Sequence, residues 1–166
     1  MIDVPWAKLV KALNDFFDLD ITDYQALAEF RYQLRCFLAF SEQAARAAGL
    51  EPQQHQLLLA LKGFYEDKKV TIGDLAERLK IQHHSAVELV NRMSKRNLVQ
   101  RDRDKQDQRR VLVTLTPYGE EVLHKLSVLH CIELRSTGPA LVDILQAIIG
   151  APLETDTHND NISSEK

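Results

Sequence analysis

The sequence contains little cysteine, no long apolar run and no secretory signal. Its 166 residues include two cysteines, Cys36 and Cys131, and neither belongs to a CxxC motif of the kind that binds zinc or performs redox chemistry. No apolar run approaches the ~20 residues of a membrane-spanning helix, and the first residues lack the charged start and apolar centre of a signal peptide. We therefore expect a cytoplasmic protein with no membrane partner and no structural disulfide.

The chain also lacks the usual signals of an enzyme. Its six glycines are scattered between positions 49 and 150 and form no phosphate-binding loop. No nucleophile stands at a recognisable spacing from a base, and no set of cysteine, histidine and carboxylate residues has metal-ligand spacing. These absences favour a protein that is not an enzyme and that carries no metal or other cofactor.

Charge is unevenly distributed along the sequence. Apolar residues make up 45% of the chain and charged residues 27%, values typical of one soluble globular domain. The formal net charge is -3, yet the segment 78–110 holds ten basic residues and four acidic ones. A local excess of cations matters more to a nucleic-acid surface than the net charge does. The segment 78–110 is therefore the part of the chain best suited to an anionic partner.

The N-terminal part of the chain has the apolar spacing of amphipathic helices. A short helix is expected after Pro5, and a longer one from a cap at Thr22 or Asp23 to just before Gly49. A third helix should begin at Pro52, because proline is favoured in the first helical turn. The length of the second helix suggests a scaffold or dimer element.

The C-terminal part is expected to hold two helices and a tail. Thr116-Pro117 has the residue types of a helix start. Gly138-Pro139 is expected to break this helix, and a strongly apolar helix should follow to about Ile149. Residues 151–166 are polar and acidic, which predicts a disordered tail.

The segment 70–116 predicts a helix-turn-helix followed by a β-hairpin. Helices over 72–79 and 83–96 are separated by a three-residue turn. Strand-like runs over 98–103 and 110–116 flank a charged loop, as in a hairpin. We predict a mainly α protein with a small β-hairpin wing (α+β). The buried stripe of the second helix should consist of Ala86, Leu89, Val90 and Met93.

Five features of this segment, in order, resemble the sequence pattern of the MarR family of winged helix-turn-helix transcription regulators. They are a leucine-alanine pair, an apolar stripe, a leucine-valine pair, a DxxDxR loop and an LTxxG helix start. Here these features are Leu75-Ala76, Ala86 to Met93, Leu98-Val99, Asp104 to Arg109, and Leu115 to Gly119. Since all five occur together, the resemblance is more specific than a helix-turn-helix pattern alone.

The resemblance implies a homodimer that binds a pseudo-palindromic operator in double-stranded DNA. Residues 1–50 and 117–150 would supply dimerisation helices, and residues 51–116 a DNA-binding lobe with its recognition helix at 83–96 and its wing at 99–116. Such a protein would be a repressor released by a small-molecule signal. The alternative is a winged-helix module that binds another protein and no specific DNA, which the fold alone permits.

The outward face of the helix at 83–96 supplies candidates for contact with DNA. Opposite the buried stripe, His84, Glu88 and Asn91 point outward with Val87 beside them, and these four are candidates for base edges. Glu88 is a departure, since some family members carry arginine there. The alternative is a solvated helix face. Candidate phosphate contacts are Ser85, Arg92, Lys95, Arg101, Arg103, Lys105 and Arg110.

The wing and the histidine pair carry further hypotheses. Arg109 is expected to enter the minor groove, oriented by a charge-assisted hydrogen bond that its guanidinium donates to the carboxylate of Asp107, an arrangement that the family resemblance also implies. His83 and His84 titrate near neutrality and would strengthen DNA binding as the pH falls. Metal binding is the alternative for this pair, but no Cys or carboxylate partner stands at ligand spacing.

A ligand pocket and a thiol are the remaining candidates. Tyr32, Phe40, His55 and Phe64 are candidates to line a pocket for a small aromatic ligand, and a place in the core is at least as good an interpretation of each. The resemblance also includes organic hydroperoxide sensors that use a thiol near the chain start. Cys36 is instead expected to be packed among apolar neighbours on its helix and unreactive.

Overall fold

A computed structural model describes residues 19–64 and 69–150 of the chain. The helix expected after Pro5 and the expected disordered tail, 151–166, lie outside the described residues. The structure separates into two compact units, of which one is Cys36–Thr137 and the other includes the described residues 19–35 and 138–150. Two long helices, α2 (Ile21–Ala47) and α6 (Pro117–Gly150), each contribute residues to both units.

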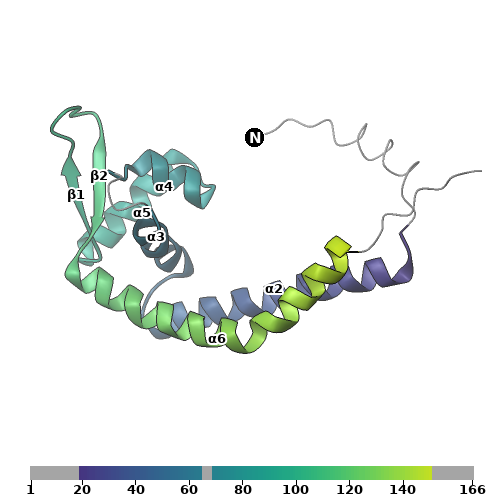
Figure 1. Cartoon of the computed structure of the whole chain (residues 1–166). Helices are drawn as coiled ribbons and strands as arrows, with labels where there is room; N and C mark the ends of the chain where they lie inside the picture. Colours follow the sequence, from purple (N-terminus) through teal and green to yellow (C-terminus); the bar gives the residue numbers. More distant parts are fainter. Residues whose placement is uncertain (1–18, 65–68, 151–166) are drawn as a thin grey trace, which may run out of the picture. The chain divides into compact units, whose positions relative to one another are not determined.

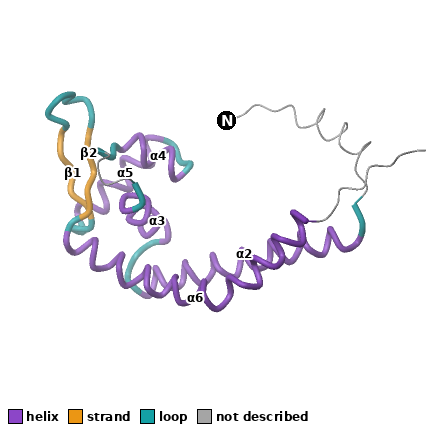
Figure 2. The backbone as a smooth tube through the Cα atoms, viewed as in Figure 1, coloured by secondary structure: helices purple, strands orange, loops and turns teal. Residues whose placement is uncertain are grey.

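The unit Cys36–Thr137 holds the remaining described elements (Figure 1). They are α3 (Pro52–Lys62), α4 (Ile72–Leu79), α5 (His83–Lys95), β1 (Val99–Arg103) and β2 (Val111–Leu115). The strands pair antiparallel, with Val99 opposite Leu115 and Arg103 opposite Val111. The tip loop of this hairpin lies at the end away from the start of α6 (Figure 2). The predicted fold, mainly α with a small β-hairpin, is confirmed.

Capping residues define the predicted helix-turn-helix. Thr71 caps α4: its hydroxyl accepts from the backbone N–H of Asp74 at 3.2 Å, and the Asp74 carboxylate accepts from the N–H of Thr71 at 2.8 Å. Lys80 then adopts the left-handed conformation at φ 54° and ends α4. After the turn, α5 begins at His83, where the sequence placed the second helix. Asn97, shortly after the end of α5, also has a positive φ, 55°, a conformation that asparagine adopts more readily than most other residues with a Cβ.

The core of the unit Cys36–Thr137 lies between the helices and the base of the hairpin. The predicted stripe of α5 is fully buried, and it packs with residues of α3 and the strands in one apolar cluster. Each fully buried leucine or valine contributes roughly 1.5–3 kcal/mol of transfer free energy. The largest buried side chains are Leu57, Leu58, Leu75, Leu89, Met93, Leu98, Leu126, Val90, Val99, Val113 and Asp104.

The start of α6 is locked to the hairpin. The Thr116 hydroxyl accepts from the N–H of Gly119 at 3.0 Å and donates to the carbonyl of Asn97 at 2.5 Å, so the predicted cap is confirmed. A Cβ on Gly119 would lie 2.0 Å from the carbonyl oxygen of Leu98. Glycine is therefore required here by close packing, which accounts for the glycine of the LTxxG pattern.

Two predictions about the long helices are wrong. The cap of α2 is Asp20 and not Thr22 or Asp23: its carboxylate accepts from the N–H of Thr22 at 2.6 Å and of Asp23 at 3.0 Å. Asp23 lies in the first turn and returns a bond to the N–H of Asp20 at 3.0 Å. In addition, α6 continues through Pro139. A proline removes one hydrogen bond of the ladder, at a cost of about 3 kcal/mol, and does not have to end a long helix.

The end of α2 agrees with the sequence, while the surroundings of Cys36 do not. Gly49 has φ +74° and follows the helix end, and the N–H of Leu50 donates to the carbonyl of Ala45 at 2.9 Å. Cys36 is exposed in this chain and not packed among apolar neighbours. Residues one or two positions away along a helix point in other directions, so they do not surround the thiol. Among residues 19–64 and 69–150, no helix is both long and apolar enough to cross a membrane.

Candidate nucleic-acid interface

The outward face of α5 is polar and accessible. His84 and Glu88 are exposed, and Val87 and Asn91 are partly exposed on the side away from the buried stripe. The Glu88 carboxylate lies 4.0 Å from the guanidinium of Arg92, one turn further along the helix. This ion pair partly neutralises the acidic residue. Of the phosphate candidates on α5, Ser85 is half-buried and Lys95 is exposed.

A hydrogen bond links the outward face of α5 to the hairpin. Nη1 of Arg101, on β1, donates to Oδ1 of Asn91. The acceptor must be the amide oxygen, because a guanidinium only donates. The NH2 group of Asn91 keeps its two donors for another partner. Sequence reasoning treated Asn91 and Arg101 as separate contacts and missed this pair, since ten residues separate them.

Alternation along β1 sorts its side chains by charge. Arg101 and Arg103 share the face of the strand on which Val99 is buried, while Gln100 and Asp102 lie on the other face. On that second face, Nε2 of Gln100 donates to the Asp102 carboxylate at 3.1 Å. The predicted phosphate candidates of β1 are thus on one face, and the acidic residue is on the other.

The wing loop is held by a buried carboxylate, that of Asp104. Its side chain is 2% exposed, accepts from the N–H of Gln106 at 3.0 Å, and lies 3.5 Å from Lys69 and 3.7 Å from Arg110. The Gln106 hydrogen bond is the largest cause that lowers the pKa of Asp104 below its usual value, and the two cations act in the same direction. Sequence reasoning missed this anchoring role, although the DxxDxR pattern contains Asp104.

Asp107 contacts the backbone of the wing loop. Its carboxylate accepts from the backbone N–H of Arg109 at 3.0 Å, and its carbonyl accepts from the N–H of Arg110 at 2.9 Å. The expected bond was one that the guanidinium of Arg109 donates to Asp107; the observed contact instead holds Arg109 through its main chain. Both Arg109 and Lys105 are exposed.

A hollow of about 370 Å³, which we call the wing-side hollow, joins α5 to the hairpin. Its lining includes His83 and Val87 of α5 together with Arg101, Arg109 and Arg110 of the hairpin. Residues predicted separately from the helix and from the wing therefore share one concave, cationic surface. Guanidinium groups with donors fixed in a plane are suited to phosphate oxygens, so this surface can bind the backbone of a nucleic acid.

Two of the four pocket candidates meet at one histidine. The ring of His130, on α6, contacts the rings of both Phe40 and His55, with ring centroids 5.7 Å and 4.7 Å away. Nδ1 of His130 donates to the carbonyl of Leu126 at 2.6 Å, and its Nε2 lies 2.8 Å from the hydroxyl of Ser41. His55 is 3% exposed, and burial, with a smaller effect of His130, lowers its pKa to about 4.

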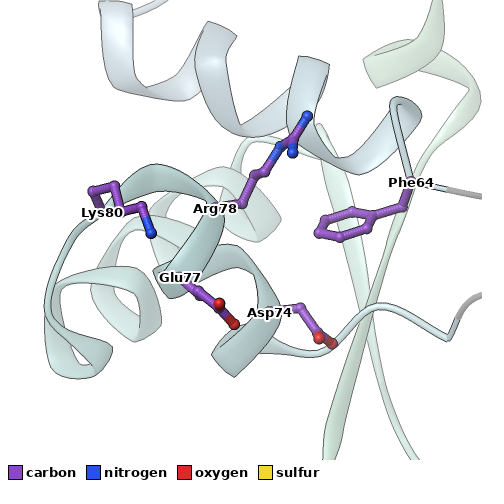
Figure 3. Close-up of a pocket in the computed structure, with 5 residues that line it drawn as sticks. All are labelled: Phe64, Asp74, Glu77, Arg78 and Lys80. Carbon is purple, nitrogen blue, oxygen red and sulfur yellow. The ribbon is translucent and has the colours of Figure 1, made fainter. Parts of the chain in front are cut away.

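The other two pocket candidates lie elsewhere. Phe64 lines a hollow of about 390 Å³ with Asp74, Glu77, Arg78 and Lys80, as Figure 3 shows. The four charged residues come from α4 and the residue that follows it, while Phe64 follows α3. Tyr32, on α2, is 53% exposed. The structure thus brings Phe40 and His55 together around His130 and gives Phe64 a charged setting.

These features define a winged helix-turn-helix protein, with α4 and α5 as the helix pair and β1 and β2 as the wing. Residues 48–110 match the sequence model of the MarR family. The uncharacterized HTH-type transcriptional regulator YsmB of Bacillus subtilis is 29% identical over 104 residues, which cover 60% of this chain and 69% of YsmB.

Solved structures share the fold. AbsC, a MarR family transcriptional regulator from Streptomyces coelicolor, matches with a TM-score of 0.62 and 22% identity over 81% of this chain and 99% of the AbsC chain. A mutant of S. aureus MepR bound to an oligodeoxyribonucleotide matches with a TM-score of 0.59 and 19% identity, over 73% of this chain and 96% of the MepR chain.

The segment 48–110 therefore has the sequence pattern of the MarR family, and the chain shares the winged helix-turn-helix fold of solved MarR-family structures. The relatives found are transcription regulators and not enzymes, which agrees with the expectation from the sequence.

Proposed function

We propose that this chain is a MarR-family regulator that acts as a homodimer, binds a pseudo-palindromic operator in double-stranded DNA and represses transcription until a small molecule releases it. The wing-side hollow is the observation that carries the proposal, because it brings His83 and Val87 of α5 together with three arginines of the hairpin. The DNA complex of MepR supports binding to the same kind of partner through the shared fold.

The proposed binding mode places α5 in the major groove. His84, Val87, Glu88 and Asn91 would then face base edges, since these are the outward residues of the helix. Because Arg101 occupies one lone pair of the Asn91 amide oxygen, the NH2 group is the part of Asn91 best placed to donate to a base. Arg109 would reach the adjacent minor groove from the wing loop.

The dimer proposal rests on the apolar side chains that both long helices expose. Ile21 and Tyr24 of α2 are 69% and 57% exposed, and Ile132 and Ile149 of α6 are 59% and 80% exposed. Monomeric proteins rarely leave such series of large apolar residues in water. A second copy of the chain is the occupant that a two-fold operator requires.

Release by an aromatic ligand is the third part of the proposal. Of the candidates Tyr32, Phe40, His55 and Phe64, we favour Phe40 and His55, because each has the ring of His130 as an edge-on or tilted neighbour. Titration of the operator complex with a set of aromatic acids tests this step: release by one of them, lost in Phe40→Ala, supports it. Release unaffected by changes at all four positions contradicts the pocket.

The experiment for DNA binding begins with selection of bound fragments from random duplexes. The expected product is a pseudo-palindrome with half-sites about one helical turn, ~10 bp, apart. Binding to the selected duplex should weaken steeply as salt is added, because phosphate contacts release counterions. If the chain selects no sequence and binding to duplex DNA is absent even at low salt, a module that binds protein would replace this proposal.

A further inference from the structure

One guanidinium joins three helix ends in the unit Cys36–Thr137. Arg96, the residue directly after α5, donates from Nη2 to the carbonyl oxygen of Gly49 at 2.7 Å and from Nη1 to Oε1 of Gln54 at 2.8 Å. Gly49 follows the end of α2, and Gln54 lies in the first turn of α3. The end of α5 is therefore tied to the junction between α2 and α3.

Both acceptors are fixed without the help of Arg96. Gly49 is held by the turn that closes α2, in which its N–H donates to the carbonyl of Arg46 at 2.9 Å. Gln54 is 4% exposed, and its Oε1 also accepts from the N–H of Glu51 at 3.0 Å in the capping box of α3. The acceptors therefore determine where the guanidinium lies, and with it the end of α5.

Arginine has the chemistry that this junction needs. Its planar fork can bond two acceptors at once, whereas the ammonium of lysine is a single point of charge on a flexible stem. The carbonyl beyond the end of α2 also carries the partial negative charge of a helix C-terminus, which a cation stabilises. A lysine at position 96 would retain the charge and lose the two-point attachment.

The apolar core does not fix the direction of α5 in the same way. The buried stripe of α5 packs in the main cluster and supplies most of the driving force for docking. Apolar burial is non-directional, whereas hydrogen bonds fail when their angles depart far from linearity. The two bonds of Arg96 can thus set the orientation of α5 in a lobe that folds without them.

We propose that Arg96 is a positioning residue that sets the direction of α5 relative to the end of α2, and so the separation of half-sites that the protein accepts. The inference rests on the proposed function, in which α2 contributes to the dimer and α5 reads DNA. In a two-fold dimer each half-site receives one recognition helix. A change in the direction of α5 in both chains therefore alters the distance between the two recognition helices.

The alternative role for Arg96 is a phosphate contact, because its side chain is accessible. Two substitutions separate the roles. Arg96→Lys keeps the charge and loses the fork, while Arg96→Gln loses both. If Arg96 contacts a phosphate, Arg96→Lys should bind DNA as the parent does. Arg96→Gln should then lower the salt slope, the steepness with which the logarithm of the DNA-binding constant falls with the logarithm of salt concentration, by about one unit. If Arg96 is a positioning residue, the two variants should show the same change in the preference for half-site spacing, and the salt slope should be that of the parent.

The DNA experiment measures affinity for the selected operator and for duplexes with the half-sites moved one base pair apart or together. We expect both Arg96 variants to reduce the preference for the selected spacing about tenfold. Arg46→Lys, the same change at an exposed arginine of α2 that is no candidate for DNA contact and pairs with Glu42, is the matched control and should retain the preference. Unchanged spacing preference in both Arg96 variants would overturn the inference.

Hydrogen exchange on the free protein tests the junction without DNA. The N–H of Asn97, which donates to the carbonyl of Ser94 at 3.0 Å at the end of α5, should exchange several-fold faster in Arg96→Lys than in the parent, because the end of α5 loses its attachment to Gly49 and Gln54. Exchange at the same rate would contradict the inference. If the parent protein binds no duplex DNA, the proposed function fails, and the exchange result still decides whether Arg96 fixes the junction.

Discussion

Large apolar side chains are buried in the interior of the winged lobe, residues 51–116, but are exposed on the outer surfaces of the two long helices. In the lobe, the stripe of α5 is buried within the chain, with Val90 and Met93 fully inaccessible. On α2 and α6, large apolar side chains such as Ile21 and Ile132 remain mostly exposed. A single chain therefore completes the core of the lobe, whereas the long helices carry apolar surface that a partner would have to cover.

The largest expected effect is on the free energy of unfolding, and it is measured by alanine substitution of two glycines of α6. Gly119→Ala should lower the free energy of unfolding by about 3 kcal/mol or more, because its Cβ would lie 2.0 Å from a backbone oxygen of Leu98. Gly138→Ala, on α6, meets nothing within 4 Å in this chain and should stabilise by roughly 0.5–1 kcal/mol through helix propensity. Urea unfolding of both variants measures the difference.

If Gly138→Ala lowered the free energy of unfolding more than Gly119→Ala did, the close packing described at the start of α6 would be contradicted. A Gly138→Ala variant that weakens the dimer while Gly119→Ala behaves as described would instead show that a partner chain lies close to position 138.

The buried His55 predicts the next effect, a loss of stability in mild acid. Its pKa is about 4 in the folded chain and 6.5 ordinarily, so between these values the unfolded chain binds a proton that the folded chain does not. The contribution of neutral His55 to the free energy of unfolding is therefore full above pH 6.5, and this free energy should fall by roughly 3 kcal/mol as the pH approaches 4. Urea unfolding between pH 7 and 5 should detect about half of this change. In His55→Gln the same interval should give a much flatter curve, and an equally steep one would rule out His55 as the cause.

The smallest expected effects are on DNA binding, and they differ between a substitution in the wing and one in the recognition helix. Arg109→Ala should weaken binding to operator and unrelated duplex alike and reduce the salt slope by about one unit. Asn91→Ala should leave the slope nearly unchanged and weaken operator binding by roughly 1–3 kcal/mol, with relaxed preference at one position in each half-site.

The hydrogen bond between Asn91 and Arg101 makes a control necessary. Arg101→Gln, which loses the same bond from the other side, should reproduce any purely structural effect of Asn91→Ala. If the two variants lose preference at the same base, or if Asn91→Ala weakens all sequences equally, Asn91 supports the wing and does not read a base.

The sequence predicted the lobe well because its signals are local and agree with one another. The stripe of α5, the turn before His83 and the positive φ of Asn97 all follow from the spacing and residue types of one short segment. Asp104 and Arg96 were missed as anchors, since their partners, such as Lys69 and Gln54, become neighbours only when the chain folds.

The long helices were predicted less well for a physical reason. A proline predicts a helix end from local sterics alone, yet α6 continues through Pro139. The apolar neighbours of Cys36 in sequence suggested burial, yet the thiol is exposed, because the side chains that adjoin it on a helix are three and four residues away. Where apolar surface faces outward, the sequence alone does not distinguish core from interface.

The number of chains on one operator duplex tests the account most directly. Sedimentation of the protein with the selected pseudo-palindrome should show two chains per duplex, and the free protein should remain a dimer at low concentration. Ile132→Asp, which places a charge on the exposed apolar surface of α6, should dissociate the free dimer and leave the lobe folded. One chain per duplex, or a parent protein that sediments as a monomer, would contradict the account.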